Sequence, residues 1–214
     1  MRLIQLLKQQ GLTTSQIKVY QLNNQILVNG TKQKLACPLV NQDVVTLNGE
    51  VIKEKPLAYY LYNKPVGVVC TNNPSVKNSI AGLFKGLNAS CVGRLDKESH
   101  GLIILTNDGQ FSRSVLTSEE FAKTYLVEVE GPITEEFKQR MSEPFVLRGR
   151  TSKEVAITYL DDFHFEITLK EGMYHQIRKM VIASHNRVTD LYRIQIGPYL
   201  VEGLPEGQLK QIDK

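Results

Sequence analysis

The feature that most constrains the fold is a succession of short apolar segments, rich in Val, Ile, Leu and Tyr, that runs from residue 58 to residue 196. Such segments are typical of strands, which we predict at 58–62, 67–71, 102–106, 123–130, 154–160, 163–170 and 190–196. Helices are predicted between them at 110–117, 134–141 and 174–185. Because the strands follow one another without a regular β-α-β alternation, the pattern predicts an α+β domain with a mixed, mostly antiparallel sheet flanked by helices.

The first 50 residues carry a different pattern, which predicts two short helices and a small hairpin. The first amphipathic segment stops at Gly11, and Thr13 or Thr14 can cap the second helix. Two Asn-Gly turn signals, at 29–30 and 48–49, follow short apolar segments. The predicted organisation is a small domain at 1–50, a polar linker at 51–57 and a larger domain at 58–214.

The positive charge is concentrated in the small domain. The whole chain has a formal net charge of +4, and residues 1–50, with basic residues at 2, 8, 18, 32 and 34 and acidic ones at 43 and 50, account for +3 of it. A charge of this size does not by itself identify a nucleic-acid binder, but its position makes the small domain the better candidate for contact with phosphate.

The small domain resembles the RNA-binding module first described in a ribosomal small-subunit protein, with Val28-Asn29-Gly30 following the second helix. The resemblance implies RNA binding by the basic residues Arg2, Lys8, Lys18 and Lys32. Two segments depart from the family pattern, because Ile4-Gln5 stands in place of Asp-Lys and Thr14-Ser15 in place of Ser-Arg. The alternative is a helical cap that only packs on the larger domain.

The segment from Gly93 to Gly109 is the most informative part of the larger domain. It reads Gly-Arg-Leu-Asp-Lys-Glu-Ser-His-Gly-Leu-Ile-Ile-Leu-Thr-Asn-Asp-Gly. Two glycines frame a polar loop that leads into an apolar strand, so a side chain on this loop would be held firmly in place. On periodicity alone, a charged surface loop with a solvated Arg94 and Asp96 is the simpler interpretation.

The whole string resembles the signature of pseudouridine synthases of the RsuA type, which isomerise uridine in RNA. Other segments match the family in the same order, namely 63–67 (Asn-Lys-Pro-Val-Gly), 123–127 (Lys-Thr-Tyr-Leu-Val) and 171–180 (Glu-Gly-Met-Tyr-His-Gln-Ile-Arg-Lys-Met). The resemblance implies the pseudouridine synthase fold for residues 58–214 and makes Asp96 the catalytic residue. It also implies that Tyr125 lies beneath the target uracil and that Arg94 fills the gap left by the extruded base or holds a phosphate.

The chemistry of this reaction agrees with the residues present. The N1–C1′ bond breaks, the uracil turns within the site, and C5 joins C1′, so no redox partner, metal or energy source is needed. We therefore expect no cofactor and no metal. A carboxylate such as Asp96 can attack carbon directly or remove a sugar proton, and both routes stay open.

A buried, ionised carboxylate is stabilised by a cation beside it. The family match makes Arg178 the predicted partner of Asp96, with His175 one turn earlier on the same helix face and available to RNA. The alternative for Arg178 is a solvated helix charge. Lys64 is a further candidate for RNA contact, although the Lys64-Pro65 pair also suits a purely architectural role.

Ribosomal RNA is the expected partner, and the small-subunit RNA is the preferred target. Tyr174-His175-Gln176 looks more like the small-subunit enzymes than like their large-subunit relatives, which more often carry Asn-Arg there. The alternatives are a large-subunit enzyme and a non-catalytic RNA-binding assembly factor. A partly assembled small subunit is another possible substrate, and further basic candidates for a phosphate-contacting rim are Lys85, Lys97, Arg113, Lys123, Arg148 and Arg150.

Several classes of protein are excluded by what the sequence lacks. The three cysteines, Cys37, Cys70 and Cys91, are odd in number and have no Cys-x-x-Cys spacing, which argues against a disulfide framework and a zinc site. No apolar run reaches the roughly 18–20 residues that cross a bilayer, and the start lacks a signal-peptide core. We expect a monomer in the cytoplasm, with no membrane association.

Overall fold

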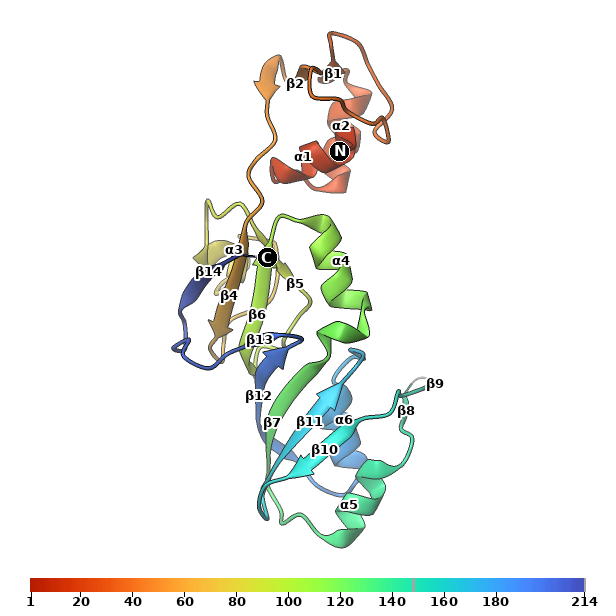
Figure 1. The fold of residues 1–214 in the computed structure, drawn as a ribbon, viewed down its shortest axis with the longest axis vertical. Helices are drawn as coiled ribbons and strands as arrows, with labels where there is room; N and C mark the ends of the chain where they lie inside the picture. The colour runs from red at the N-terminus through yellow and green to blue at the C-terminus, as the bar shows by residue number, and fades with distance from the viewer. Residues whose placement is uncertain (148, 214) are drawn as a thin grey trace. The chain divides into compact units, whose positions relative to one another are not determined.

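The computed structural model describes residues 1–147 and 149–213 (Figure 1). The chain divides into two compact units, one made of Met1–Ala58 with Gly86–Asn88 and the other of Tyr59–Lys85 with the residues from Ala89 onward. The first unit therefore includes the segment 51–57, which the sequence analysis treats as a linker. Arg148, one of the basic residues predicted for the rim, lies outside the described residues.

The first unit contains two helices and a small sheet around one apolar core. Its elements are α1 (Leu3–Gln9), α2 (Thr14–Leu22), β1 (Ile26–Val28), β2 (Val45–Leu47) and β3 (Glu50–Ile52), with the antiparallel strand order β1-β2-β3. Thr13 caps α2, because its side chain accepts a hydrogen bond from the backbone N–H of Gln16. The turn at 48–49 leads into β3, a strand that the sequence analysis did not predict.

The second unit is built on one large sheet. Its strands are β4 (Tyr59–Lys64), β5 (Ser90–Val92), β6 (His100–Thr106), β7 (Lys123–Val129), β10 (Ala156–Tyr159), β11 (His164–Leu169), β12 (Val188–Ile196), β13 (Tyr199–Leu200) and β14 (Leu209–Ile212). The order is β10-β11-β7-β12-β6-β4-β14, with β13 beside β12 and β5 beside β6. Among the described residues, β12 and β6 pair in parallel and the other neighbours pair antiparallel. The predicted α+β class with a mixed, mostly antiparallel sheet is confirmed.

The helices of this unit lie against the sheet, as Figure 1 shows for α5 and α6 beside the β7-β11-β10 half. They are α3 (Ile80–Leu83), α4 (Gly109–Thr117), the 3-10 helix η1 (Glu119–Phe121), α5 (Glu135–Ser142) and α6 (Gln176–Ala183). Phe137 and Met141 of α5 share a core with Met180 and Val181 of α6. Asp108 caps α4, since its Oδ1 accepts hydrogen bonds from the backbone N–H groups of residues 110 and 111.

One predicted strand is wrong, and several short ones were missed. The segment 67–71 forms a single bridge, between Val69 and Ser79, and is held instead by the burial of Val68 and Cys70. The missed strands include β5, β13, β14 and the pair β8 (Val146–Leu147) and β9 (Arg150–Thr151). They are two to four residues long, too short to show the alternation on which a sequence prediction depends.

The parallel pair at the centre of the sheet fixes the geometry of the site. Lys64 is paired with Gly101, Gly101 with Arg193, and Arg193 with Tyr125, so these four positions form one row across β4, β6, β12 and β7. A Cβ atom on Gly101 would lie 2.3 Å from the backbone oxygen of Arg193, and Gly101 also has a φ of +109°. The second glycine of the loop therefore lets β12 approach β6 at this row.

Candidate active site

Asp96 lies on the loop that joins β5 to β6, and this loop is anchored at both ends. Leu95 is buried, and the side chain of Ser99 is completely buried on the other side of Asp96. The backbone N–H of Ser99 donates to the carbonyl of Asp96 at 3.2 Å, and that of Gly67 donates to the carbonyl of Lys97 at 2.8 Å. The loop is therefore a rigid mount for the carboxylate, as the sequence analysis expected of this segment.

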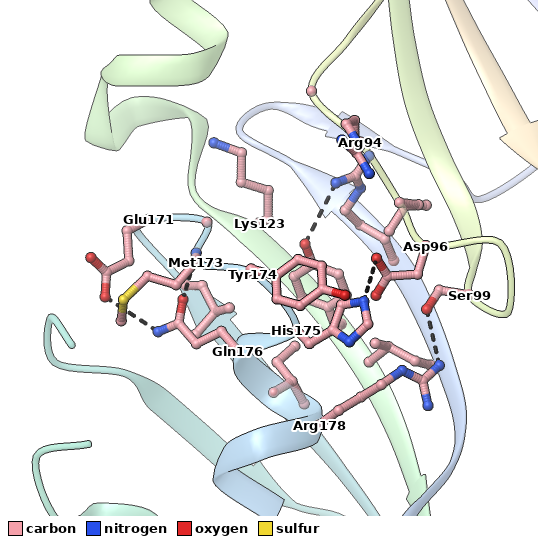
Figure 2. A pocket seen from close by; sticks show the side chains of 18 of the residues that line it. Arg94, Asp96, Ser99, Lys123, Glu171, Met173, Tyr174, His175, Gln176 and Arg178 are labelled. Carbon is pink, nitrogen blue, oxygen red and sulfur yellow. Dashed lines mark hydrogen bonds and ion pairs between the residues drawn. The ribbon is translucent and has the colours of Figure 1, made fainter. Parts of the chain in front are cut away.

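A cavity of about 420 Å³ opens beside this loop (Figure 2). Its wall is formed by the loop, by β7 and β12, and by the segment from Glu171 to Arg178. The predicted site residues that line it are Asp96, Tyr125, Arg178, Arg94 and His175. Side chains that are distant in the sequence thus converge on one pocket large enough to take a base.

The partner of the Asp96 carboxylate differs from the one that the sequence analysis predicted. His175 Nε2 lies 3.2 Å from Asp96 Oδ1, and the two side chains are 34% and 27% exposed. Arg178 Nη2 donates instead to Ser99 Oγ at 3.0 Å. Among the described residues, no ion pair joins Arg178 to Asp96, so the predicted pair is wrong for this conformation (Figure 2).

The start of α6 explains why His175 replaces Arg178. Sequence analysis placed both residues on one helix face, but α6 begins at Gln176 and His175 is its N-cap in a left-handed conformation, with φ 53° and ψ 35°. Such a conformation is uncommon for a residue with a side chain and is found at functional sites. The imidazole also stacks on Tyr174, with ring centroids 3.9 Å apart. His175 is therefore held against Asp96 from two sides.

Tyr125 lies on β7 with its ring on the pocket wall and is partly buried. Its hydroxyl oxygen lies 3.5 Å from Nη1 of Arg193, and the guanidinium lies 5.9 Å from the centre of the Tyr125 ring. The tyrosine packs against two apolar clusters of the unit, so it is both a core residue and a wall of the pocket.

Arg193 is the site residue that sequence analysis missed. It lines the pocket and is only 4% exposed. The sequence signal was a single cation inside a strand segment of mostly apolar residues, Leu191-Tyr192-Arg193-Ile194-Gln195-Ile196. A charged residue at such a position is almost never buried without a reason.

Lys64 does not face the pocket or the solvent. Its side chain is completely buried, and its Nζ donates to the backbone carbonyls of Pro65 and Val68 at 2.9 and 3.0 Å. Burial lowers the pKa of Lys64, and the negative Asp96 nearby is one of the groups that oppose this shift. The prediction that Lys64 contacts RNA is therefore wrong for this structure, because the ammonium group anchors the backbone after β4.

The other basic residues occupy two kinds of position. Arg94 is exposed on the loop at the pocket. Lys123 also lines the pocket, where its Nζ donates to the carbonyl of Val115 at 2.9 Å, and burial together with the nearby Arg193 lowers its pKa. In the first unit, the exposed basic residues predicted to bind RNA are Arg2, Lys8, Lys18 and Lys32.

Two kinds of feature are absent from the described residues. Within residues 1–147 and 149–213, no three His, Cys, Asp or Glu side chains gather in a way that could hold a metal ion. In the same ranges, no helix combines the length and the apolar character that crossing a bilayer requires.

Comparison with known proteins places this site in a family. The profile of RNA pseudouridylate synthases matches residues 58–183. Ribosomal small subunit pseudouridine synthase A of Haemophilus influenzae is 32% identical in an alignment that covers 86% of this chain and 91% of that protein. The dual-specificity RNA pseudouridine synthase RluF of Escherichia coli is 33% identical over 192 residues, which cover 87% of this chain and 66% of that protein.

A solved structure extends the similarity to the whole chain. A crystal structure of a pseudouridylate synthase, 31% identical in sequence, superposes with a TM-score of 0.69 and covers 100% of this chain and 96% of that one. The chain therefore belongs to the RNA pseudouridylate synthase family and is a pseudouridine synthase.

Proposed function

We propose that this enzyme isomerises a uridine of ribosomal RNA, with small-subunit RNA as its target and Asp96 as the catalytic residue. The observation that carries the proposal is the convergence of Asp96, Tyr125 and His175 on one pocket of about 420 Å³. The small-subunit target is supported by the relatives from Haemophilus influenzae and Pasteurella multocida, both named ribosomal small subunit pseudouridine synthase A. The sequence Tyr174-His175-Gln176 supports the same target.

Asp96 is suited to act on the ribose of the target nucleotide. Its carboxylate is partly shielded from water and has an imidazole nitrogen at 3.2 Å, which holds it in one position on the pocket wall. The carboxylate then acts as a nucleophile at C1′ or as a base on a sugar proton. Arg178 supports the loop through Ser99, which ties α6 to the residues that carry Asp96.

The target base must leave its stack to enter this pocket, which costs a few kcal/mol and less in a loop than in a duplex. Tyr125 offers a flat ring for the extruded uracil and a hydroxyl for proton transfer at C5. Arg94, exposed beside Asp96, is placed to fill the gap in the RNA or to hold a phosphate.

The first unit would add affinity for RNA. Arg2, Lys8, Lys18 and Lys32 are exposed, so they can approach phosphates without losing a buried partner. We propose that this unit binds RNA beside the target, on naked ribosomal RNA or on a partly assembled small subunit. The enzyme would act as a monomer in the cytoplasm, where ribosomal RNA is found.

A second target is supported by the similarity to the dual-specificity enzyme RluF. Under this alternative, the chain would modify large-subunit ribosomal RNA. The two targets share the chemistry of the pocket and differ in the RNA that the enzyme selects.

The deciding experiment is to incubate the purified protein with each ribosomal RNA separately and to map pseudouridine by chemical probing. We expect one new pseudouridine in the small-subunit RNA and none in a matched sample without enzyme. A new pseudouridine in the large-subunit RNA alone would overturn the preferred target and support the second one. Repeating the assay on small subunits purified from a strain that lacks the gene would distinguish naked RNA from the particle as substrate.

A further inference from the structure

Arg193 is a buried cation with no counter-ion among the described residues. Its Nε donates to the carbonyl of Leu102 at 2.7 Å, and its Nη1 lies 3.5 Å from the hydroxyl of Tyr125. Within residues 1–147 and 149–213, Nη2 has no hydrogen-bond partner, and no carboxylate lies within ion-pair distance of the guanidinium. The side chain is only 4% exposed.

Such an arrangement is costly for the folded protein. Buried charges are normally paired, and each buried donor without an acceptor lowers stability. The surroundings add to the cost, because burial lowers the pKa of Lys123 and of Lys64 and the nearby positive charge of Arg193 lowers both further. Arg193 and Lys123, which both line the pocket, favour a negatively charged group there.

The guanidinium also belongs to the pocket rather than to a separate core. Arg193 lines the cavity and is paired with Tyr125 in the row that crosses β6, β12 and β7. Gly101, in the same row, lacks the Cβ that would collide with the backbone of Arg193. The strand that carries Arg193 can therefore pack closely against the end of the loop that carries Asp96. The carboxylates that line the pocket, Asp96 and Glu171, have contacts with other residues.

We propose that Arg193 is a catalytic residue that stabilises negative charge on the uracil, an inference that rests on the proposed function. When the N1–C1′ bond breaks, its electron pair stays with the base, which becomes an anion with charge spread over N1 and the carbonyl oxygens. The free Nη2 edge of Arg193 donates to one of these oxygens. C5 then bonds to C1′, the C5 proton is lost and N1 gains a proton, so the product is an isomer of the substrate.

This role differs from that of a phosphate clamp and from that of a structural tie. A phosphate is bound at the surface, where Arg94 is exposed, whereas Arg193 is buried and lines the pocket together with Tyr125. A structural tie would be complete with the bond to Leu102 and would need no unpaired donor. An oxyanion-type donor in a water-excluded site acts only when charge develops, so its cost in the resting enzyme is offset in the transition state.

The test compares Arg193→Met and Arg193→Lys with Arg187→Met, a control that removes an exposed arginine paired with Glu130 shortly before β12. Single-turnover rates are measured on the ribosomal transcript that the unsubstituted enzyme modifies. We expect Arg193→Met to lower the rate about 100-fold to 1,000-fold, with unchanged RNA affinity and no loss of thermal stability. The rate of Arg193→Lys should fall between those of Arg193→Met and the unsubstituted enzyme. The rate of Arg187→Met should match that of the unsubstituted enzyme.

A second substrate separates charge stabilisation from a general disturbance of the pocket. In a transcript made with 5-fluorouridine, the fluorine makes the uracil a better leaving group, so cleavage of its N-glycosidic bond depends less on Arg193. The defect of Arg193→Met in cleaving this bond should shrink about tenfold, as expected when the missing stabilisation is partly supplied by the base itself. If Arg193→Met does not fold, the same comparison is made with Arg193→Lys.

Two outcomes would overturn the proposal. One is a rate for Arg193→Met close to that of the unsubstituted enzyme. The other is an equal loss on the uridine and 5-fluorouridine transcripts together with lower thermal stability, which is the result of a structural tie. Absence of pseudouridine with the unsubstituted enzyme would instead contradict the proposed RNA target, so the two failures are distinguishable.

Discussion

The basic residues of the first unit differ from two buried basic residues of the second unit in their contact with water. Lys8, Lys18 and Lys32 are exposed, whereas Lys64 and Arg193 are at most 4% exposed. An exposed cation attracts phosphate over a long range and is screened by salt, whereas a buried one acts over a short range on one correctly placed group. Similar side chains are thus suited to long-range attraction of phosphate in the first unit and to short-range contact with a single group in the second.

This comparison also explains which residues sequence reasoning assigned correctly. A count of charges identified the first unit as basic, because exposed charges contribute independently of the fold. Lys64 was a candidate for RNA contact with an architectural role as the alternative, and its Nζ is bonded to two backbone carbonyls inside the second unit, which agrees with the alternative. A basic residue in the sequence indicates a basic surface only where its side chain is exposed.

The largest expected effect comes from Asp96, the carboxylate that lies against His175 in the pocket. Asp96→Asn should lower the rate of pseudouridine formation at least about 10,000-fold, because the amide can act neither as a nucleophile nor as a base. RNA affinity and thermal stability should stay close to those of the unsubstituted protein. Unchanged modification in a strain that carries only this variant would show that Asp96 is not the catalytic residue.

The next test asks whether the close approach of β6 and β12 at Gly101 and Arg193 stabilises the fold. Gly101→Ala should lower the free energy of unfolding by about 2–4 kcal/mol, because the new Cβ would meet the backbone of Arg193 at 2.3 Å. Gly109→Ala is the matched control, since Gly109 begins α4 with no heavy atom near the position of a Cβ. Equal stability of the two variants in chemical denaturation would contradict this geometry.

A third test asks which basic side chain, His175 or Arg178, holds the Asp96 carboxylate in position. His175→Asn removes the nitrogen at 3.2 Å from the carboxylate and should lower the rate about 10-fold to 100-fold through misplacement of Asp96. Arg178→Met breaks the bond to Ser99 and should have a smaller effect. A larger loss for Arg178→Met in the same single-turnover assay would mean that Arg178 replaces His175 once RNA is bound.

The smallest expected effect concerns the solvated charges of the first unit. Replacing Lys8, Lys18 and Lys32 by Gln should weaken RNA binding and reduce the slope of log affinity against log salt by about 0.7–0.9 for each phosphate that these lysines neutralise. The rate at saturating RNA should stay unchanged. Lys210→Gln, which removes an exposed charge from β14, provides the control. An identical slope for the triple variant and the unsubstituted protein in a salt titration would show that the first unit does not bind RNA through these lysines.

Much of the second unit could be predicted from local sequence. The strands at 102–106, 123–130 and 163–170 correspond to β6, β7 and β11, because each is long enough to show its apolar pattern. The loop with Asp96 and the segment that carries His175 are continuous strings, so each could be assigned before its neighbours were known. Their meeting in one pocket followed from the family resemblance and not from periodicity.

The sequence by itself determined the α+β class, the loop that carries Asp96 and the basic character of the first unit, because each depends on residues that are neighbours in the chain. The tertiary structure decided that His175, and not Arg178, faces Asp96, since the left-handed backbone at residue 175 changes where α6 begins. It also decided that Arg193 stands beside Tyr125, since their strands meet only through the pairing of the sheet. Contacts between distant strands follow from register, and register is set by the packing of the whole sheet.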